Sequence, residues 1–145
     1  MPFVRVETNR KFSKELSQDV ITQITEAIHL NKGDQKPMIS VVVNTNVNVG
    51  FGGDYDKPAA IVQVLNLKMP VEITTKLTEN ISDILLKNFN VPANRIYIFF
   101  QEFTQMHLVG WNRKTFAEIV GGDDLEALEA ARKKAEEKKR ATNQY

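Results

Sequence analysis

The sequence predicts an α+β fold in which a strand–helix–strand unit occurs twice. Four short segments are rich in β-branched or alternating apolar residues, and the two long segments between them repeat apolar residues every three to four positions. A strand–helix–strand unit favours a right-handed crossover between parallel strands. Two such units side by side predict duplicated βαβ units that form a four-stranded mixed sheet with two helices on one face, followed by an extra C-terminal helix.

The first unit occupies residues 2–43. Alternation predicts a strand from Pro2 to Thr8, and residues 39–43 form a β-branched run that is typical of a strand. Between them a helix is predicted from Phe12, ended by residues 31–34, which include a glycine. The apolar face of this helix comprises Phe12, Leu16, Val20, Ile21, Ile24, Ala27 and Ile28.

The second unit follows a connection rich in Asn, Gly and Asp at residues 44–56. Residues 60–67 and 95–100 are predicted strands. Pro70 suits the first turn of the helix between them, and residues 90–92 end that helix. Its apolar face comprises Ile73, Leu77, Ile81, Ile84, Leu85 and Phe89.

One face of this predicted sheet has no helix to cover it. The strands are apolar on both faces, as residues 39–43 and 96–100 illustrate. A large exposed apolar face is unfavourable in a monomer, so we expect the chain to associate with itself.

The carboxyl-terminal residues differ in character from the rest, so we divide the chain into a domain at 2–117 and a charged helical extension at 118–145. Asp123 is the expected N-cap, with Glu126 three residues later as in a capping box. Acidic residues come first and basic residues last, which matches the helix dipole. Residues 121–145 of this extension contain six basic and six acidic residues, so we interpret it as a solvated helix. A basic arm for anionic lipid or RNA is the alternative interpretation.

Composition excludes several classes of function. The 145 residues suffice for one compact domain, and 19 basic against 18 acidic residues give no broad charge for nucleic acid. The absence of cysteine excludes disulfide and thiolate chemistry, and the two histidines lack ligand-like neighbours, so no metal or other cofactor is expected. No stretch reaches the length of a membrane span, and polar residues from Arg5 onward interrupt the apolar run that a signal peptide needs, so we expect neither. We therefore expect a cytoplasmic protein, whose secretion would need a route without a signal peptide.

Pro2 is the residue with the most specific chemistry. Removal of Met1 would leave a secondary amine at the terminus. An α-amino group has a pKa of roughly 7.7–8.0, and burial beside apolar side chains lowers it, which is the condition for a general base near neutral pH. The alternative is that Pro2 has no role beyond providing a small residue after Met1 is removed.

Four motifs in order make this chain resemble the macrophage migration inhibitory factor and D-dopachrome tautomerase family. They are residues 1–9 (MPFVRVETN), Phe51-Gly52-Gly53, Asn94-Arg95-Ile96-Tyr97-Ile98, and Val109-Gly110-Trp111-Asn112 with Thr115-Phe116-Ala117. The resemblance covers residues 2–117. It implies a homotrimer with inter-subunit strands and a site at each subunit boundary, with Pro2 at its base.

The activity that the resemblance implies is keto–enol tautomerisation of phenylpyruvate-like or dopachrome-like substrates, without a cofactor. The implied catalytic residue is Pro2. The implied substrate-binding residues are Lys32 for a substrate carboxylate, Leu67, Tyr97 from a neighbouring subunit, and the apolar rim of Val109, Trp111 and Phe116. The partners implied are other copies of the chain and a small aromatic keto acid. The alternative function is that of a non-enzymatic signalling ligand that binds a cell-surface receptor.

Three departures from the family pattern bear on these roles. Asp34 stands at the family's lysine position, with Lys32 and Lys36 on either side; we favour Lys32 as the carboxylate-binding residue, with Lys36 as the alternative. Phe99 stands where the cytokine member of the family, to which macrophage migration inhibitory factor gives its name, has an asparagine. Residues 58–61 replace its Cys-x-x-Cys, so thiol redox activity is not expected.

Overall fold

The computed structural model of the chain describes residues 1–121 and 125–143. It divides into two compact units, Met1–Glu102 and Phe103–Tyr145. The first unit holds the main sheet and two long helices, and the second holds a short hairpin and two further helices.

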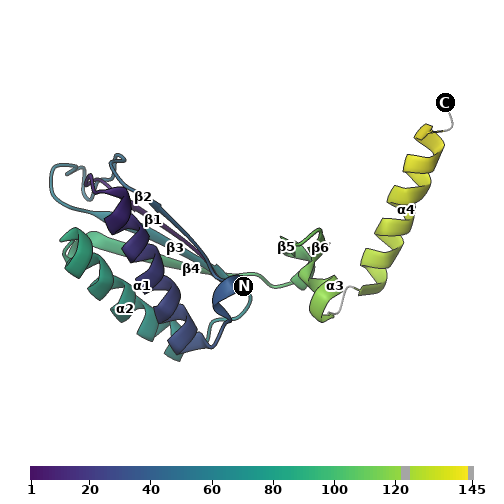
Figure 1. The fold of residues 1–145 in the computed structure, drawn as a ribbon, viewed down its shortest axis with the longest axis horizontal. Helices are drawn as coiled ribbons and strands as arrows, with labels where there is room; N and C mark the ends of the chain where they lie inside the picture. The colour runs from purple at the N-terminus through teal and green to yellow at the C-terminus, as the bar shows by residue number, and fades with distance from the viewer. Residues whose placement is uncertain (122–124, 144–145) are drawn as a thin grey trace. The chain divides into compact units, whose positions relative to one another are not determined.

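The four strands of the first unit form one mixed sheet in the order β2–β1–β3–β4 (Figure 1). β1 (Phe3–Thr8) is parallel to β2 (Ser40–Asn44) and antiparallel to β3 (Ala60–Asn66), which is parallel to β4 (Ile96–Glu102). Each strand–helix–strand unit therefore contributes one parallel pair, and β1 and β3 join the two pairs. The predicted sheet is confirmed.

Both long helices, α1 (Lys14–Lys32) and α2 (Val71–Phe89), lie on the same face of the sheet (Figure 1). The Ser13 side chain caps the start of α1 by accepting a hydrogen bond from the Leu16 N–H at 3.2 Å. Gly33 ends α1 with a φ of 82°, a left-handed conformation that costs glycine little.

Pro70 stands one residue earlier relative to α2 than predicted. It is the N-cap, with φ −60° and ψ 159°, and Val71 is the first helical residue. Asn90 ends the helix in a left-handed conformation with φ 54°. Because proline lacks an N–H, either position leaves no extra donor unsatisfied at the helix start.

The hydrophobic core lies between this sheet face and the two helices. Alternate residues of β1 and β3 point into it and are almost completely buried: Val4, Val6, Val62 and Val64. The helices contribute Val20, Ile24, Ile28, Leu77, Ile81, Leu85 and Phe89, all predicted from the apolar periodicity. Phe12 stacks on Phe89 with ring centroids 4.3 Å apart. Burial of these side chains fixes which face of β1 points inward.

The opposite face of the sheet carries no described helix of the first unit. Tyr97 and Phe99 on β4 are 58% and 55% exposed there. Such exposure of large aromatic side chains agrees with the expected uncovered face, and self-association of the chain stays a prediction.

The second unit contains a short hairpin and a short helix that are not among the predicted elements. β5 (Gly110–Trp111) and β6 (Lys114–Thr115) pair through Asn112 and Arg113, both of which have positive φ. α3 (Phe116–Val120) begins with a capping box between Thr115 and Glu118. The T-x-x-E spacing at 115–118 is the sequence signature of that cap.

The extra C-terminal helix is confirmed as α4 (Leu125–Asn143). Its predicted N-cap, Asp123, lies outside the described residues. Arg132 of α4 forms an ion pair with Glu118 of α3. Every α4 side chain whose exposure is described is exposed, so the helix has few apolar contacts within its unit.

We expect deletion of residues 122–145 to leave the urea midpoint of the remaining chain nearly unchanged, because every α4 side chain whose exposure is described is exposed, including Arg132, which pairs with Glu118. Urea denaturation at fixed protein concentration measures this midpoint. Arg132→Ala serves as the control that removes the ion pair alone. A loss of several kcal/mol on deletion would show that α4 packs against apolar surface.

Candidate active site at the amino terminus

Pro2 lies at the start of the central strand β1 and is buried. Its carbonyl oxygen accepts a hydrogen bond from the Ser40 N–H of β2 at 3.1 Å. The next residue, Phe3, is paired with Ser40 on one side and with Leu65 of β3 on the other. The backbone around Pro2 is therefore fixed by two neighbouring strands.

The terminal amine of Met1 points at two acceptor oxygens. Its nitrogen lies 3.4 Å from Oδ1 of Asn66 and 3.6 Å from Oδ1 of Asp34. Asn66 ends β3 and is only 1% exposed. The Leu67 N–H donates to the same Asn66 Oδ1 at 2.8 Å, which fixes the orientation of the amide group.

Asp34 and Lys32 form an ion pair beside this amine. Nζ of Lys32 lies 3.2 Å from Oδ2 of Asp34, and both side chains are 16% exposed. The turn at Gly33 brings Asp34 back toward the last turn of α1, where Nδ1 of His29 donates to the Asp34 carbonyl oxygen at 2.8 Å. The end of α1 therefore places one cation and one anion near the amino terminus.

These surroundings act on the amine in opposite directions. Burial lowers the pKa of the Met1 ammonium below its ordinary value. The Asp34 carboxylate raises that pKa by its charge and by a hydrogen bond, while the Lys32 ammonium lowers it. The net pKa is lowered, so the cost of removing water from the charged amine outweighs the attraction of Asp34.

Of the two lysines weighed for carboxylate binding, Lys32 is the one near the amino terminus. Lys36 forms an ion pair with Glu26 on α1, and both of those side chains are about half exposed. Leu67 directly follows Asn66 and is half-buried. The structure thus gathers Pro2, Lys32 and Leu67 at one end of the sheet.

Tyr97 lies toward the other end of the sheet in the same chain. It pairs with Ile61 of β3, and Ile61 pairs with Glu7 of β1. Glu7 is five residues from Pro2, which at about 3.3 Å per residue places Tyr97 roughly 17 Å further along the strands. A single chain therefore does not bring Tyr97 to its own Pro2.

Two of the sequence motifs anchor the loop that carries Phe51, whose ring stacks on Tyr97. The Asn9 side chain bonds the backbone of the loop: its Nδ2 donates to the Lys57 carbonyl oxygen at 2.8 Å, and its Oδ1 accepts from the Ala59 N–H at 2.9 Å. Arg95 donates to the Pro58 carbonyl oxygen at 2.9 Å. The loop in turn holds Phe51 against Tyr97, and Tyr97 stacks on Phe99, with ring centroids 5.2 and 5.7 Å apart.

The predicted apolar rim belongs to the second unit. The Val109 carbonyl oxygen accepts a hydrogen bond from the Phe116 N–H at 2.8 Å. Phe116 is 5% exposed, so it packs within its unit. Trp111, in contrast, is 47% exposed and lines a hollow with Arg132.

The sequence did not predict Asn66 as a site residue. It pointed to Asp34 only because Asp34 stands at the family's lysine position. Asn66 is a polar residue at the end of an apolar strand, and a buried amide in that position needs hydrogen-bond partners. Its Nδ2 has none among the described residues. That pattern is the sequence signal that could have identified it.

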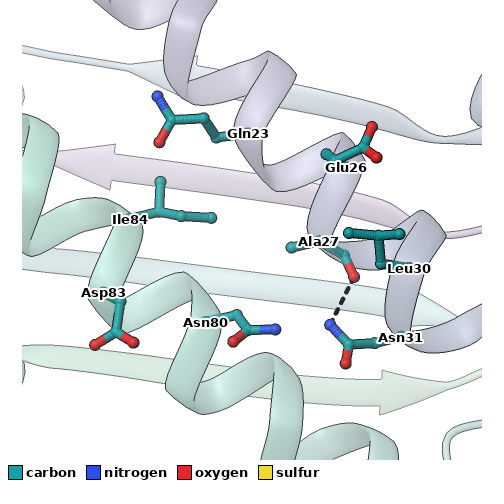
Figure 2. Close-up of a pocket in the computed structure, with 8 residues that line it drawn as sticks. All are labelled: Gln23, Glu26, Ala27, Leu30, Asn31, Asn80, Asp83 and Ile84. Carbon is teal, nitrogen blue, oxygen red and sulfur yellow. Dashed lines mark hydrogen bonds between the residues drawn. The ribbon is translucent and has the colours of Figure 1, made fainter.

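A groove between α1 and α2 lies on the side of the helices away from the sheet (Figure 2). Glu26, Leu30, Asn31 and Asp83 are among the residues that line it, and none of the predicted site residues does so. Within the described part of the chain, no cluster of three metal-ligating side chains is found. No helix in that same part is both long and apolar enough to cross a bilayer.

We expect Asp34→Asn to lower the pKa of the terminal amine further and Lys32→Ala to raise it, because the two charges act on it with opposite sign. At a fixed pH near that pKa, the neutral fraction of the amine therefore rises in the first variant and falls in the second. NMR titration of the reductively ¹³C-methylated amine measures both shifts. Asp19→Asn, an exposed position on α1, is the control. Shifts of the same sign in the two site variants would contradict this electrostatic description.

Comparison with known proteins agrees with the fold and with the motifs. Residues 1–117 match the family described as macrophage migration inhibitory factor (MIF). The chain is 27% identical over 118 residues to macrophage migration inhibitory factor of Xenopus laevis, covering 81% of this chain and all of that protein.

Solved structures show the same fold. The homologue from Prochlorococcus marinus is 20% identical, with a TM-score of 0.73 over 79% of this chain and 98% of the other. The structure of Pt0534 inactivated by 2-oxo-3-pentynoate is also similar. That protein is 14% identical to this chain, with a TM-score of 0.73 over 82% of this chain and 98% of the Pt0534 chain. On the match of residues 1–117, the chain belongs to the macrophage migration inhibitory factor family.

Proposed function

We propose that the protein is a keto–enol tautomerase that uses the Pro2 amine as its general base, once Met1 has been removed. Its substrates are enolisable carbonyl compounds of the phenylpyruvate or dopachrome type. The observation that carries the proposal is the buried Pro2 at the start of the central strand β1, next to a terminal amine that lies beside Lys32, Asp34 and Asn66.

The reaction moves one proton and leaves the composition of the substrate unchanged. The neutral Pro2 nitrogen takes a proton from the carbon beside the carbonyl group, and the electrons of that C–H bond form the carbon–carbon double bond. The carbonyl oxygen becomes an enolate and then takes the proton from the Pro2 ammonium, which returns Pro2 to its neutral state. Hydrogen-bond donors near the enolate oxygen lower the barrier.

The chemistry of the amine supports this role. Burial lowers the pKa of the Met1 ammonium, and we expect burial to act in the same direction on the Pro2 amine one residue further on, which would increase the fraction of neutral amine near pH 7. The ring of proline fixes φ and so restricts the direction of the lone pair. Pt0534 has the same fold and is inactivated by 2-oxo-3-pentynoate, whose name describes a 2-oxo acid.

A homotrimer would complete the site. Tyr97 lies far along the sheet from Pro2 of its own chain, as the strand register indicates. The open face of the sheet and the exposed Tyr97–Phe99 stack favour pairing with another copy. In such an assembly Tyr97 of one subunit would serve the amine of the next, and Val109, Trp111 and Phe116 would form the apolar rim.

The second candidate is a signalling ligand that binds a cell-surface receptor without catalysis. The name of the Xenopus laevis relative favours it. The ion pair that Lys32 makes with Asp34 favours it as well, because a lysine already paired with a carboxylate is less able to bind a keto acid.

We expect the chain without Met1 to tautomerise phenylpyruvate or its methyl ester, with a rate that rises with pH as the Pro2 ammonium loses its proton. Pro2→Gly keeps a terminal amine but changes its basicity and orientation, so kcat/KM should fall at least tenfold while the far-UV circular dichroism stays unchanged. A chain that retains Met1 should be inactive and equally folded, which intact mass and thermal denaturation would check. Turnover at the native rate by either form would exclude the proline mechanism and leave signalling as the leading function.

We expect sedimentation equilibrium to give three times the chain mass of 16.5 kDa. Phe99→Asp should dissociate the assembly, because it places a charge on the open face of the sheet. Leu30→Asp is the matched control, since Leu30 is 72% exposed on the outer side of α1. A native chain that stays monomeric at micromolar concentration would contradict the shared site.

A further inference from the structure

Two hydrogen-bond acceptors lie at the amine next to Pro2, and the lysine beside them, Lys32, is already paired. The Met1 ammonium is a hydrogen-bond donor, and it shows how a donor group of a ligand beside Pro2 would be bound. It is held by Oδ1 of Asn66 at 3.4 Å and Oδ1 of Asp34 at 3.6 Å. Loss of Met1 would leave these two oxygens facing the new terminus and whatever binds next to it.

The charge of Lys32 is compensated before any substrate arrives. Its Nζ lies 3.2 Å from Asp34 Oδ2, and both side chains are only 16% exposed, so water screens the pair poorly. A substrate carboxylate bound to Lys32 at a usual distance of about 2.8 Å would lie within about 6 Å of the Asp34 carboxylate. Two like charges that close in a poorly hydrated site disfavour each other.

The other basic residues nearby do not replace Lys32. Lys36 is paired with Glu26. The guanidinium of Arg5 lies over the ring of Phe3. Arg5 and Phe3 alternate along β1 with the buried Val4 and Val6, so they point to the face of the sheet opposite the core. Lys68, just beyond β3, is exposed, so water screens its charge.

Asn66 supplies what an uncharged carbonyl compound needs. Its Nδ2 is buried and has no hydrogen-bond partner among the described residues, while its Oδ1 is oriented by the Leu67 N–H. A buried N–H without a partner is costly unless something accepts from it. A carbonyl oxygen that gains negative charge on enolisation is a suitable acceptor.

Resting on the proposed tautomerase function, we propose that the site selects an uncharged carbonyl compound with a hydrogen-bond donor next to the carbonyl group, in preference to a keto acid. Asp34 accepts from the donor and repels a carboxylate. The amide of Asn66 donates to the carbonyl oxygen and to the enolate that forms from it.

Three substrates of one shape test this selectivity: phenylpyruvate, its methyl ester and its primary amide. In the chain without Met1, kcat/KM should be highest for the amide and lowest for the acid. Asp34→Asn should raise kcat/KM for the acid at least tenfold and remove the advantage of the amide over the ester. Asp19→Asn makes the same charge change at an exposed site on α1 and should leave all three values within twofold.

Asn66→Leu should lower kcat for all three substrates more than it changes KM, because the amide acts mainly on the enolate. Thermal denaturation of each variant shows whether the fold persists. Highest activity of the native chain toward the acid, with no gain in Asp34→Asn, would overturn the inference. No turnover of any of the three would overturn the proposed function instead.

If none of the three substrates is turned over, binding of unreactive analogues still tests the selectivity. Titration calorimetry with phenylacetamide and phenylacetate should show tighter binding of the amide by the native chain. Asp34→Asn should reverse this order. Tighter binding of phenylacetate by the native chain would refute the selectivity whether or not the protein is an enzyme.

Discussion

The central position of the first strand is the constraint on which the rest of the structure depends. β1 has β2 on one side and β3 on the other, and its Val4 and Val6 are completely buried against the helices. A terminal segment in the middle of a sheet cannot fray as a free terminus does. The amino terminus is therefore held where α1 ends and β3 ends, so the fold itself brings a terminal amine beside Lys32, Asp34 and Asn66.

The chemistry at that terminus is a balance between burial and two opposite charges. Removing water from the amine favours its neutral form, and Lys32 acts in the same direction, whereas Asp34 favours the ammonium. The same Asp34 compensates Lys32 and leaves the space beside Pro2 with little net charge. Burial and the Asp34–Lys32 pair thus act together on the basicity of the amine, and in the selectivity that we propose the same pair disfavours a charged ligand.

The second region of interest lies toward the other end of the sheet. There Asn9 and Arg95 bond the backbone of residues 54–59, and Phe51, which pairs through its backbone with Asp54, stacks on Tyr97. The motifs that mark the family in the sequence therefore shape two separate regions of one chain, and the strand register keeps them apart. Bringing both to one substrate requires a second copy, and the open sheet face between them is the surface that could pair with it.

The sequence alone determined the duplicated strand–helix–strand order and the core residues of both helices, because apolar periodicity and caps are local patterns. The catalytic role of Pro2 stays a prediction. The sequence did not predict the hairpin and α3, which are too short to show an apolar period and which depend on the turn at Asn112–Arg113 and the Thr115–Glu118 cap. It also could not place Asn66 beside the amine, or show that Lys32 is paired with Asp34. Those contacts join residues up to 65 positions apart or depend on how a turn points a side chain. Only the register of β1 with β3, and the packing of α1 on the sheet, decided them.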